Sequence, residues 1–276
     1  MKKIFFMTNQ LEKLISKLSV IANDRSSGAL DIVFAISDVV LDALNNRIIN
    51  NNTRKVLMKA LKVLKIKQGA FIVVNKLISS IESILDTTSD PAKQLYDFII
   101  FTKEYYERLS ERQADKFLKL GIDTRKILVH SNSYSVKHFL LTLKKKGVII
   151  QEIIQTASLP GNEGILQADC LKKYAFQVRI IGDEQVTTVM KNIDVVFLGS
   201  DLILNDSFIN KVKTLYICKY MRQANIPVYV LADKNKIISH EEEQQYKTNL
   251  IKITDKEGNK LFEEIPKKAV TGFLIP

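Results

Sequence analysis

The stretch Ile193–Lys211, IDVVFLGSDLILNDSFINK, decides the fold class of this chain. Its first part, Val195 to Leu198 with Ile193 upstream, is a short apolar run, which is typical of a buried strand. The run stops at Gly199 and Ser200, and Asp201 follows directly. A carboxylate just beyond the carboxyl end of a buried strand lies where open α/β sheets bind their ligands. Asp201 is therefore the first candidate catalytic or binding residue.

The second part of the stretch predicts a helix. After a polar turn at 205–207, apolar residues recur at helical spacing, so we expect a helix from Ser207 to Ala224. Asn210 and Lys211 would lie in its first turns, where free backbone N–H groups and the helix dipole favour an anion. Asp201 is alternatively a turn or helix cap, as aspartates after strands often are.

Strands and helices alternate over the whole second part of the chain. Strands are predicted at 127–129, 148–154, 176–181, 195–198, 227–231 and 250–253, and helices at 135–146, 163–174, up to 189, and 207–224. Short connections between alternating strands and helices indicate a mostly parallel sheet with helices on both faces. We expect a Rossmann-like ligand-binding domain at 121–276.

The first 120 residues predict helices alone. Apolar residues recur at helical spacing at 11–18, 30–40, 56–64, 70–85 and 92–109. Nothing in this part alternates with a period of two, so strands are not expected. The fold class is thus α/β, with a helical N-terminal domain at 1–120.

The composition narrows the classes of function. The chain has 276 residues, 46 % of them hydrophobic, and its net charge is +11. No apolar run reaches the roughly 18–20 residues of a membrane helix, and the apolar run after Met1 is too short for a signal peptide, so a cytoplasmic location is expected. The lysines are spread without interleaved aromatic residues, and no nucleic-acid partner is expected. Neither the two cysteines nor the three histidines have metal-ligand spacing, so free thiols, no metal and no cofactor are expected.

Gly199-Ser200-Asp201, the Asn205 turn and Asn210-Lys211 resemble the G-[AS]-D…N-G…N-K pattern of a family with two branches. One branch comprises methylthioribose-1-phosphate isomerase and ribose-1,5-bisphosphate isomerase. The other comprises the alpha, beta and delta regulatory subunits of translation initiation factor 2B. Asp206 stands where the family usually has glycine. The resemblance implies the same two-domain fold and assembly through the C-terminal domain, as a homodimer or a larger homo-oligomer.

A second candidate site follows the strand at 127–129. His130, Ser131, Asn132 and Ser133 precede a helix, where hydroxyls and free N–H groups bind phosphate, although ordinary capping by Ser133 explains the same pattern. In the isomerases the corresponding pattern is T-H-C-N, and the cysteine is the catalytic partner of the aspartate. Ser131 stands in its place. A serine hydroxyl has no useful acidity near neutral pH, so Ser131 is expected to be a poor proton donor.

Three further elements resemble ligand-binding parts of the family. The loop at 155–164 resembles E-[ST]-R-P-x-x-[EQ]-G, with Glu163 at the position that contacts sugar hydroxyls in the isomerases. Glu163 is equally explained as a first-turn carboxylate that interacts favourably with the helix dipole. Arg25 to Ala29, which includes Gly28, resembles the R-G-A phosphate loop. Lys67 stands where another element has arginine, and a lysine keeps the charge without the bidentate fork. Both basic segments are alternatively solvated surface.

Three functions remain open. The first is a translation initiation factor 2B subunit-like protein that binds a phosphorylated sugar or a nucleotide monophosphate and lacks standard isomerase activity. The second is an active aldose–ketose isomerase that uses Asp201 with Ser131 in place of the cysteine. The third is a translation-factor subunit in which the fold serves as an interaction scaffold.

Overall fold

The computed structural model describes residues 2–50 and 53–276. The contacts divide the chain into two compact units, Met1–Tyr106 and Glu107–Pro276. The boundary falls inside the helix α5 (Pro91–Leu118), whereas the change of sequence pattern lies near residue 120. The two units are described separately.

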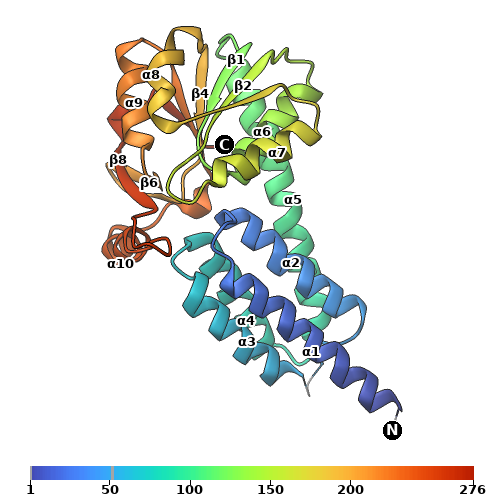
Figure 1. Ribbon diagram of the computed structural model, residues 1–276. Helices are drawn as coiled ribbons and strands as arrows, with labels where there is room; N and C mark the ends of the chain where they lie inside the picture. Colours follow the sequence, from blue (N-terminus) through green and yellow to red (C-terminus); the bar gives the residue numbers. More distant parts are fainter. Residues whose placement is uncertain (1, 51–52) are drawn as a thin grey trace. The chain divides into compact units, whose positions relative to one another are not determined.

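The first unit is helical in its described part, as its apolar spacing predicted (Figure 1). Its helices are α1 (Lys2–Asn23), α2 (Ala29–Asn45), α3 (Arg54–Gln68), α4 (Ile72–Thr87) and the first part of α5. Each helix turns one apolar stripe inward, and Leu18, Ile36, Leu61 and Ile81 are almost completely buried. Burial of each such side chain contributes about 1.5–3 kcal/mol, so packing rather than helix propensity holds the unit together.

The second unit contains a six-stranded parallel sheet in the order β3-β2-β1-β4-β7-β9. The strands are β1 (Lys126–Val129), β2 (Glu152–Thr156), β3 (Val178–Ile181), β4 (Val195–Leu198), β7 (Val228–Leu231) and β9 (Gly272–Leu274). The order reverses between β1 and β4, which pair directly, with Val129 opposite Phe197. This confirms the predicted Rossmann-like sheet and places its topological switch point at β1 and β4.

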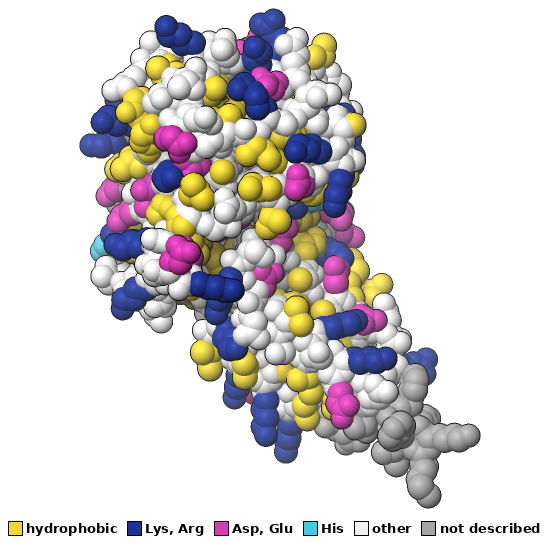
Figure 2. Space-filling model, in the orientation of Figure 1, with side chains coloured by type: hydrophobic (Ala, Val, Ile, Leu, Met, Phe, Trp, Pro, Cys, Tyr) yellow, Lys and Arg dark blue, Asp and Glu magenta, His cyan; other side chains and the backbone are white. Residues whose placement is uncertain are grey.

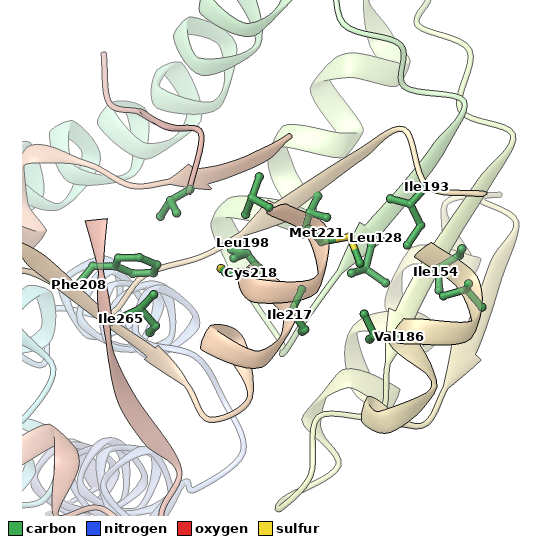
Figure 3. Close-up of a cluster of buried hydrophobic side chains, with 14 of the residues drawn as sticks. Leu128, Ile154, Val186, Ile193, Leu198, Phe208, Ile217, Cys218, Met221 and Ile265 are labelled. Carbon is green, nitrogen blue, oxygen red and sulfur yellow. The ribbon is translucent and has the colours of Figure 1, made fainter. Parts of the chain in front are cut away.

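Helices cover both faces of this sheet (Figure 1). The face lined by Leu128 packs against α8 (Val186–Val189) and α9 (Thr214–Gln223), in the cluster of Figure 3. The face lined by Ile127 and Val129 packs against α6 (Tyr134–Lys145), the end of α5, and Leu171 of α7 (Glu163–Lys173). Successive side chains of a strand point to opposite faces, so one apolar run supplies both cores.

The predicted helix from Ser207 to Ala224 is wrong over its first part. Ser207–Lys211 form strand β6, which lies between β5 (Leu202–Ile203) and β8 (Phe262–Pro266) in a small antiparallel sheet. All five residues of β6 are buried, with Phe208 in the cluster of Figure 3, so no alternation marks it as a strand. The helix α9 begins only at Thr214, after Lys213 in a left-handed conformation (φ 73°).

The predicted strand at 250–253 is also wrong, because its first two residues end the helix α10 (His240–Ile251) and the next two are not in a strand. The strands β8 and β9, which follow it, were not predicted. Short 3₁₀ turns complete the unit: η1 (Asp183–Gln185), η2 (Met190–Asn192), η3 (Lys234–Lys236) and η4 (Lys267–Ala269).

Charged side chains of both signs are interspersed with apolar ones over the face shown in Figure 2. None of the described helices combines the length and the apolar character needed to cross a membrane. Among the described residues, no three His, Cys, Asp or Glu side chains are grouped so that they could hold a metal ion.

Candidate functional site

The switch point of the sheet positions Ser131 and Asp201. Ser131 lies two residues beyond the end of β1, and Asp201 lies three residues beyond the end of β4. The two strands are neighbours and run in the same direction, so both residues lie just beyond the carboxyl edge of the sheet. Ligands of open α/β sheets bind in the crevice at this point.

Ser131, Glu163 and Lys211 form one hydrogen-bonded chain. The hydroxyl of Ser131 donates to Oε1 of Glu163 at 3.3 Å, and Nζ of Lys211 lies 2.7 Å from the same oxygen. The three residues come from the loop after β1, the first turn of α7 and the end of β6. The Lys211 side chain is only 3 % exposed, and Nζ also donates to the carbonyl of Pro160. Lys211 is therefore held inside the site rather than extended into solvent.

Burial and charge set the protonation of Glu163. Burial raises the pKa of the Glu163 carboxyl above its usual range, and the ammonium of Lys211 and the hydroxyl of Ser131 oppose that rise. Removing either partner would therefore make this carboxyl still easier to protonate.

Asp201 has the most strongly raised carboxyl pKa of the site. Burial raises the pKa of Asp201 to about 6; the nearby ammonium groups of Lys236 and Lys211 oppose the rise, and the Glu163 carboxylate adds to it. No described residue forms a hydrogen bond with its side chain, whereas its backbone N–H is fixed by the carbonyl of Ile209 at 2.8 Å. A carboxyl with this pKa exchanges a proton near neutral pH, which suits acid–base chemistry.

Lys236 belongs to the site, although the sequence analysis did not include it. It ends the turn η3 after β7, its residue is 4 % exposed, and its Nζ donates to the carbonyl of Ser200, next to Asp201. The rule that selected Asp201, a polar residue after a buried strand, would also have selected this turn, because Pro227–Leu231 was predicted as a strand. Ser200 is buried, and its hydroxyl finds no partner among the described residues.

His130 joins three segments beneath the site. Its Nε2 lies 2.9 Å from the carbonyl of Val212, and its Nδ1 lies 2.6 Å from the hydroxyl of Thr156. A carbonyl can only accept, so Nε2 carries the proton and Nδ1 accepts. Burial lowers the pKa of His130 to about 4, so the ring is neutral near pH 7. The hydroxyl of Ser158, 2.9 Å from that of Thr156, accepts the backbone N–H of Ser131 at 2.8 Å.

Asp183 fixes the loop that carries Pro160, and the sequence analysis missed it too. Its buried carboxylate accepts the backbone N–H groups of Ser158 and Leu159, both at 2.7 Å, and pairs with Lys213 at 3.0 Å. These donors hold the pKa of Asp183 below its usual range against the opposing effect of burial. Asp183 follows β3 as Asp201 follows β4, so its position after a predicted strand could have identified it from the sequence.

Ser133 and Asn210 both lie next to Gly199. A side chain on Gly199 would come within 2.7 Å of the Ser133 hydroxyl and 3.9 Å of Oδ1 of Asn210. Asn210, 4 % exposed, donates to the hydroxyl of Thr214 at 3.0 Å. Ser133 caps α6 by accepting the N–H of Val136 at 3.4 Å. Asn132 is partly exposed in the same loop.

The helix-dipole argument for Asn210 and Lys211 is wrong, because both residues lie on a strand. The true N-terminus of α9 is occupied by the chain itself. The carboxylate of Glu263 on β8 accepts the backbone N–H of Leu215 at 2.8 Å. The dipole of α9 therefore stabilises an internal carboxylate at this position.

Arg25, Gly28 and Lys67 gather within the first unit. Nη1 of Arg25 lies 3.4 Å from the carbonyl of Lys67, and Nζ of Lys67 lies 2.6 Å from Oδ1 of Asn23. Asp24 accepts the backbone N–H groups of Ser26 and Ser27, which shapes the turn before Gly28 at the start of α2. Two segments distant in sequence thus form one basic cluster within the first unit.

Comparison with known proteins gives consistent results. The model of the "Initiation factor 2 subunit family" matches residues 52–260. A "putative translation initiation factor eIF-2B subunit 2-like" protein of Pyrococcus furiosus is 26 % identical over 200 residues, which are 65 % of this chain and 72 % of that protein. Ribose 1,5-bisphosphate isomerase of Methanocaldococcus jannaschii is 31 % identical over 146 residues, 47 % of each protein. The solved translation initiation factor eIF-2B of Pyrococcus horikoshii OT3 has a TM-score of 0.72 at 19 % identity, covering 95 % of this chain and 94 % of that chain, which shows a common fold.

Proposed function

The chain belongs to the initiation factor 2 subunit family, as the Gly199–Lys211 segment predicted, and we propose that it is an initiation factor 2B subunit-like protein that binds a phosphorylated sugar or a nucleoside monophosphate. The site lies at the carboxyl ends of β1 and β4. One observation carries the proposal: Ser131, Glu163 and Lys211 form a hydrogen-bonded chain of side chains. The charges of Glu163 and Lys211 also act on the carboxyl group of Asp201.

The residue types at this site suit a phosphorylated sugar. Glu163 and Asp201 can accept hydrogen bonds from sugar hydroxyls, and Asn210 and Ser131 offer neutral polar groups. Lys211 and Lys236 place two ammonium groups beside these carboxylates, and an ammonium group can form a charge-assisted hydrogen bond with a phosphate. The first turn of α6 adds backbone N–H groups directly after the Ser131–Ser133 loop.

Standard isomerase activity is not part of the proposal, because Ser131 stands where the isomerases have their catalytic cysteine. A thiol titrates near pH 8.5, whereas a serine hydroxyl does not titrate in the physiological range. One of the two proton-transfer groups is thus missing, and such a group is worth roughly 10²–10⁴-fold in rate.

An active isomerase is the second candidate, and one observation favours it. Glu163 and Asp201 are two coupled carboxyl groups whose pKa values both lie above their usual range. Two such groups at one site can divide the roles of acid and base. Turnover of ribose 1,5-bisphosphate or methylthioribose-1-phosphate by the unmodified chain would establish this function.

A homo-oligomer formed through the second unit is also proposed. Apolar side chains are exposed along α7 and on the edge strand β3, with Leu166 50 % and Ile180 36 % exposed. Exposed apolar side chains on two elements that contact each other are a feature that an interface between subunits would cover.

A thermal-shift screen tests the ligand proposal. A ligand that binds the native state raises the melting temperature as its concentration exceeds Kd. We expect a shift with ribose 1,5-bisphosphate, another pentose phosphate or a nucleoside monophosphate, and none with the unphosphorylated sugars. If none of the phosphorylated compounds shifts the melting temperature at millimolar concentration, the scaffold function is the better description.

A further inference from the structure

From the contacts of Ser131 we infer that its hydroxyl is an activated nucleophile that takes a phosphoryl group from the phosphorylated sugar, with Glu163 as general base and Lys211 as the residue that positions this base. The inference rests on the proposed function for its phosphoryl donor. The nucleophilic character of Ser131 is independent of that donor and can be tested without it.

The geometry is that of a nucleophile, a base and a group that orients the base. The Ser131 hydroxyl already donates to Oε1 of Glu163, at 3.3 Å, so its proton has an acceptor in place. Lys211 holds the same oxygen at 2.7 Å and is itself fixed by the carbonyl of Pro160. Serine nucleophiles are activated by such an adjacent base, with distances that are often somewhat long before a substrate binds.

The backbone presents Ser131 in an unusual conformation. Its φ of 68° lies in the left-handed region, which serine rarely adopts. The Ser158 hydroxyl holds the backbone N–H of Ser131, and Asp183 in turn holds the backbone N–H of Ser158. Strained backbone is maintained only where surrounding contacts over-determine it, and it is concentrated at functional sites.

The charges around the pair suit proton removal. Burial raises the pKa of Glu163, which makes its carboxylate a stronger base than an exposed one. Lys211 counteracts this rise and so favours the ionised carboxylate, the form that acts as a base. Lys211 also offsets the charge of an incoming phosphate, and the N-terminus of α6 begins three residues after Ser131.

The proposed step balances without a redox partner. Oγ of Ser131 forms a bond to phosphorus, and the bond between phosphorus and the sugar oxygen breaks. The hydroxyl proton passes to Glu163 and then to solvent, while the departing sugar oxygen takes a proton from solvent. The products are phosphoserine at 131 and a sugar with one phosphate fewer.

Diisopropyl fluorophosphate is the probe for the nucleophile, because attack on its phosphorus releases fluoride and leaves a stable adduct. Peptide mass spectrometry is expected to find that adduct on Ser131. Ser131→Ala should abolish it, and Glu163→Gln should slow labelling by roughly 10²-fold or more. The matched controls Ser19→Ala and Glu111→Gln, both at exposed positions, should label like the unmodified protein. No adduct on Ser131, or equal rates with Glu163→Gln, overturns the inference.

Lys211→Met tests the positioning role through the pH profile of labelling. Loss of the cation raises the pKa of Glu163 further, so the rise of the labelling rate should move to higher pH. A purely structural role would lower the rate without moving the profile, and that result would contradict the assignment of Lys211. Circular dichroism and the melting temperature establish that the variants are folded.

The donor is tested separately with ribose 1,5-bisphosphate. Mass spectrometry of the incubated protein should find phosphate on Ser131, and not in Glu163→Gln. If this compound raises the melting temperature but leaves Ser131 unmodified, the transfer step is wrong while the binding site stands. If the fluorophosphate labels Ser131 but no phosphorylated sugar or nucleotide shifts the melting temperature, the nucleophile stands and the proposed function fails.

Discussion

Nζ of Lys211 and Oε1 of Glu163 lie 2.7 Å apart and join the end of β6 to the first turn of α7. The lysine side chain is almost fully buried, so the pair is shielded from solvent. Removing one partner of such a pair leaves an uncompensated buried charge, which typically costs about 3–5 kcal/mol. The pair therefore both shapes the site and couples two elements of the second unit.

A double-mutant cycle should show this coupling. We expect Lys211→Met and Glu163→Gln each to lower the free energy of unfolding by about 3–5 kcal/mol. The double variant should lose less than the sum, since neither charge is then left alone. Urea unfolding monitored by circular dichroism measures all four proteins. Strictly additive losses would show that the two side chains do not interact in solution.

Asp201→Asn should stabilise the protein at high pH. The native pKa of about 6 lies above the usual value near 3.9, so the native state holds this proton more tightly than the unfolded state. The cost of ionising Asp201 is therefore absent below about pH 4, grows up to about pH 6 and is complete above it. We expect the variant to be more stable by about 1–3 kcal/mol at pH 8 and nearly equal at about pH 3.5, below the unfolded-state pKa. A less stable variant at pH 8 would contradict the raised pKa.

The main sheet could be predicted because its strands are recognisable in the local sequence as short apolar runs. The strand at 195–198 is a short apolar run between polar residues, and its predicted and observed bounds agree. No local sequence pattern identifies β6 as a strand. All five of its residues are buried, and it pairs with β8, a strand far along the chain, so the pairing leaves no pattern in the local sequence. Short, wholly buried segments are ambiguous between helix and strand.

Two positions of the candidate site could be predicted from the strand order alone. Ser131 and Asp201 follow neighbouring parallel strands, and their position at one edge of the sheet follows from that order. The ion pair of Glu163 with Lys211 did not follow, because Lys211 was assigned to a helix. Lys236 and Asp183 were overlooked although both follow predicted strands.

Ser131→Cys should raise isomerase activity. The unmodified chain is expected to turn over ribose 1,5-bisphosphate and methylthioribose-1-phosphate little or not at all, because Ser131 cannot replace an acidic thiol. The variant supplies a group that titrates near 8.5, and general acid–base catalysis is worth roughly 10²–10⁴-fold. Ser27 and Leu159 stand where the family patterns of their loops have arginine, and Lys67 stands where a third pattern has it, so the gain is limited. Robust turnover by the unmodified chain would establish the isomerase function instead.

Leu166→Glu should weaken the proposed homo-oligomer. A charge on the exposed face of α7 would have to be desolvated at an interface formed there, which is costly. Light scattering after size-exclusion chromatography is expected to show a smaller species than for the unmodified protein. Ile66→Glu, at an exposed position in the first unit, is the matched control and should leave the mass unchanged. A monomeric unmodified protein would contradict the proposal.

Calorimetric titration with the phosphorylated compound that gives the largest thermal shift tests the central claim most directly. The unmodified protein should bind it, and Lys211→Ala should bind at least about tenfold more weakly, since a charge-assisted hydrogen bond contributes about 1.5–3 kcal/mol. Lys119→Ala, at an exposed position, should bind like the unmodified protein. Equal affinity of the unmodified protein and Lys211→Ala would place the ligand elsewhere and contradict the site at the ends of β1 and β4.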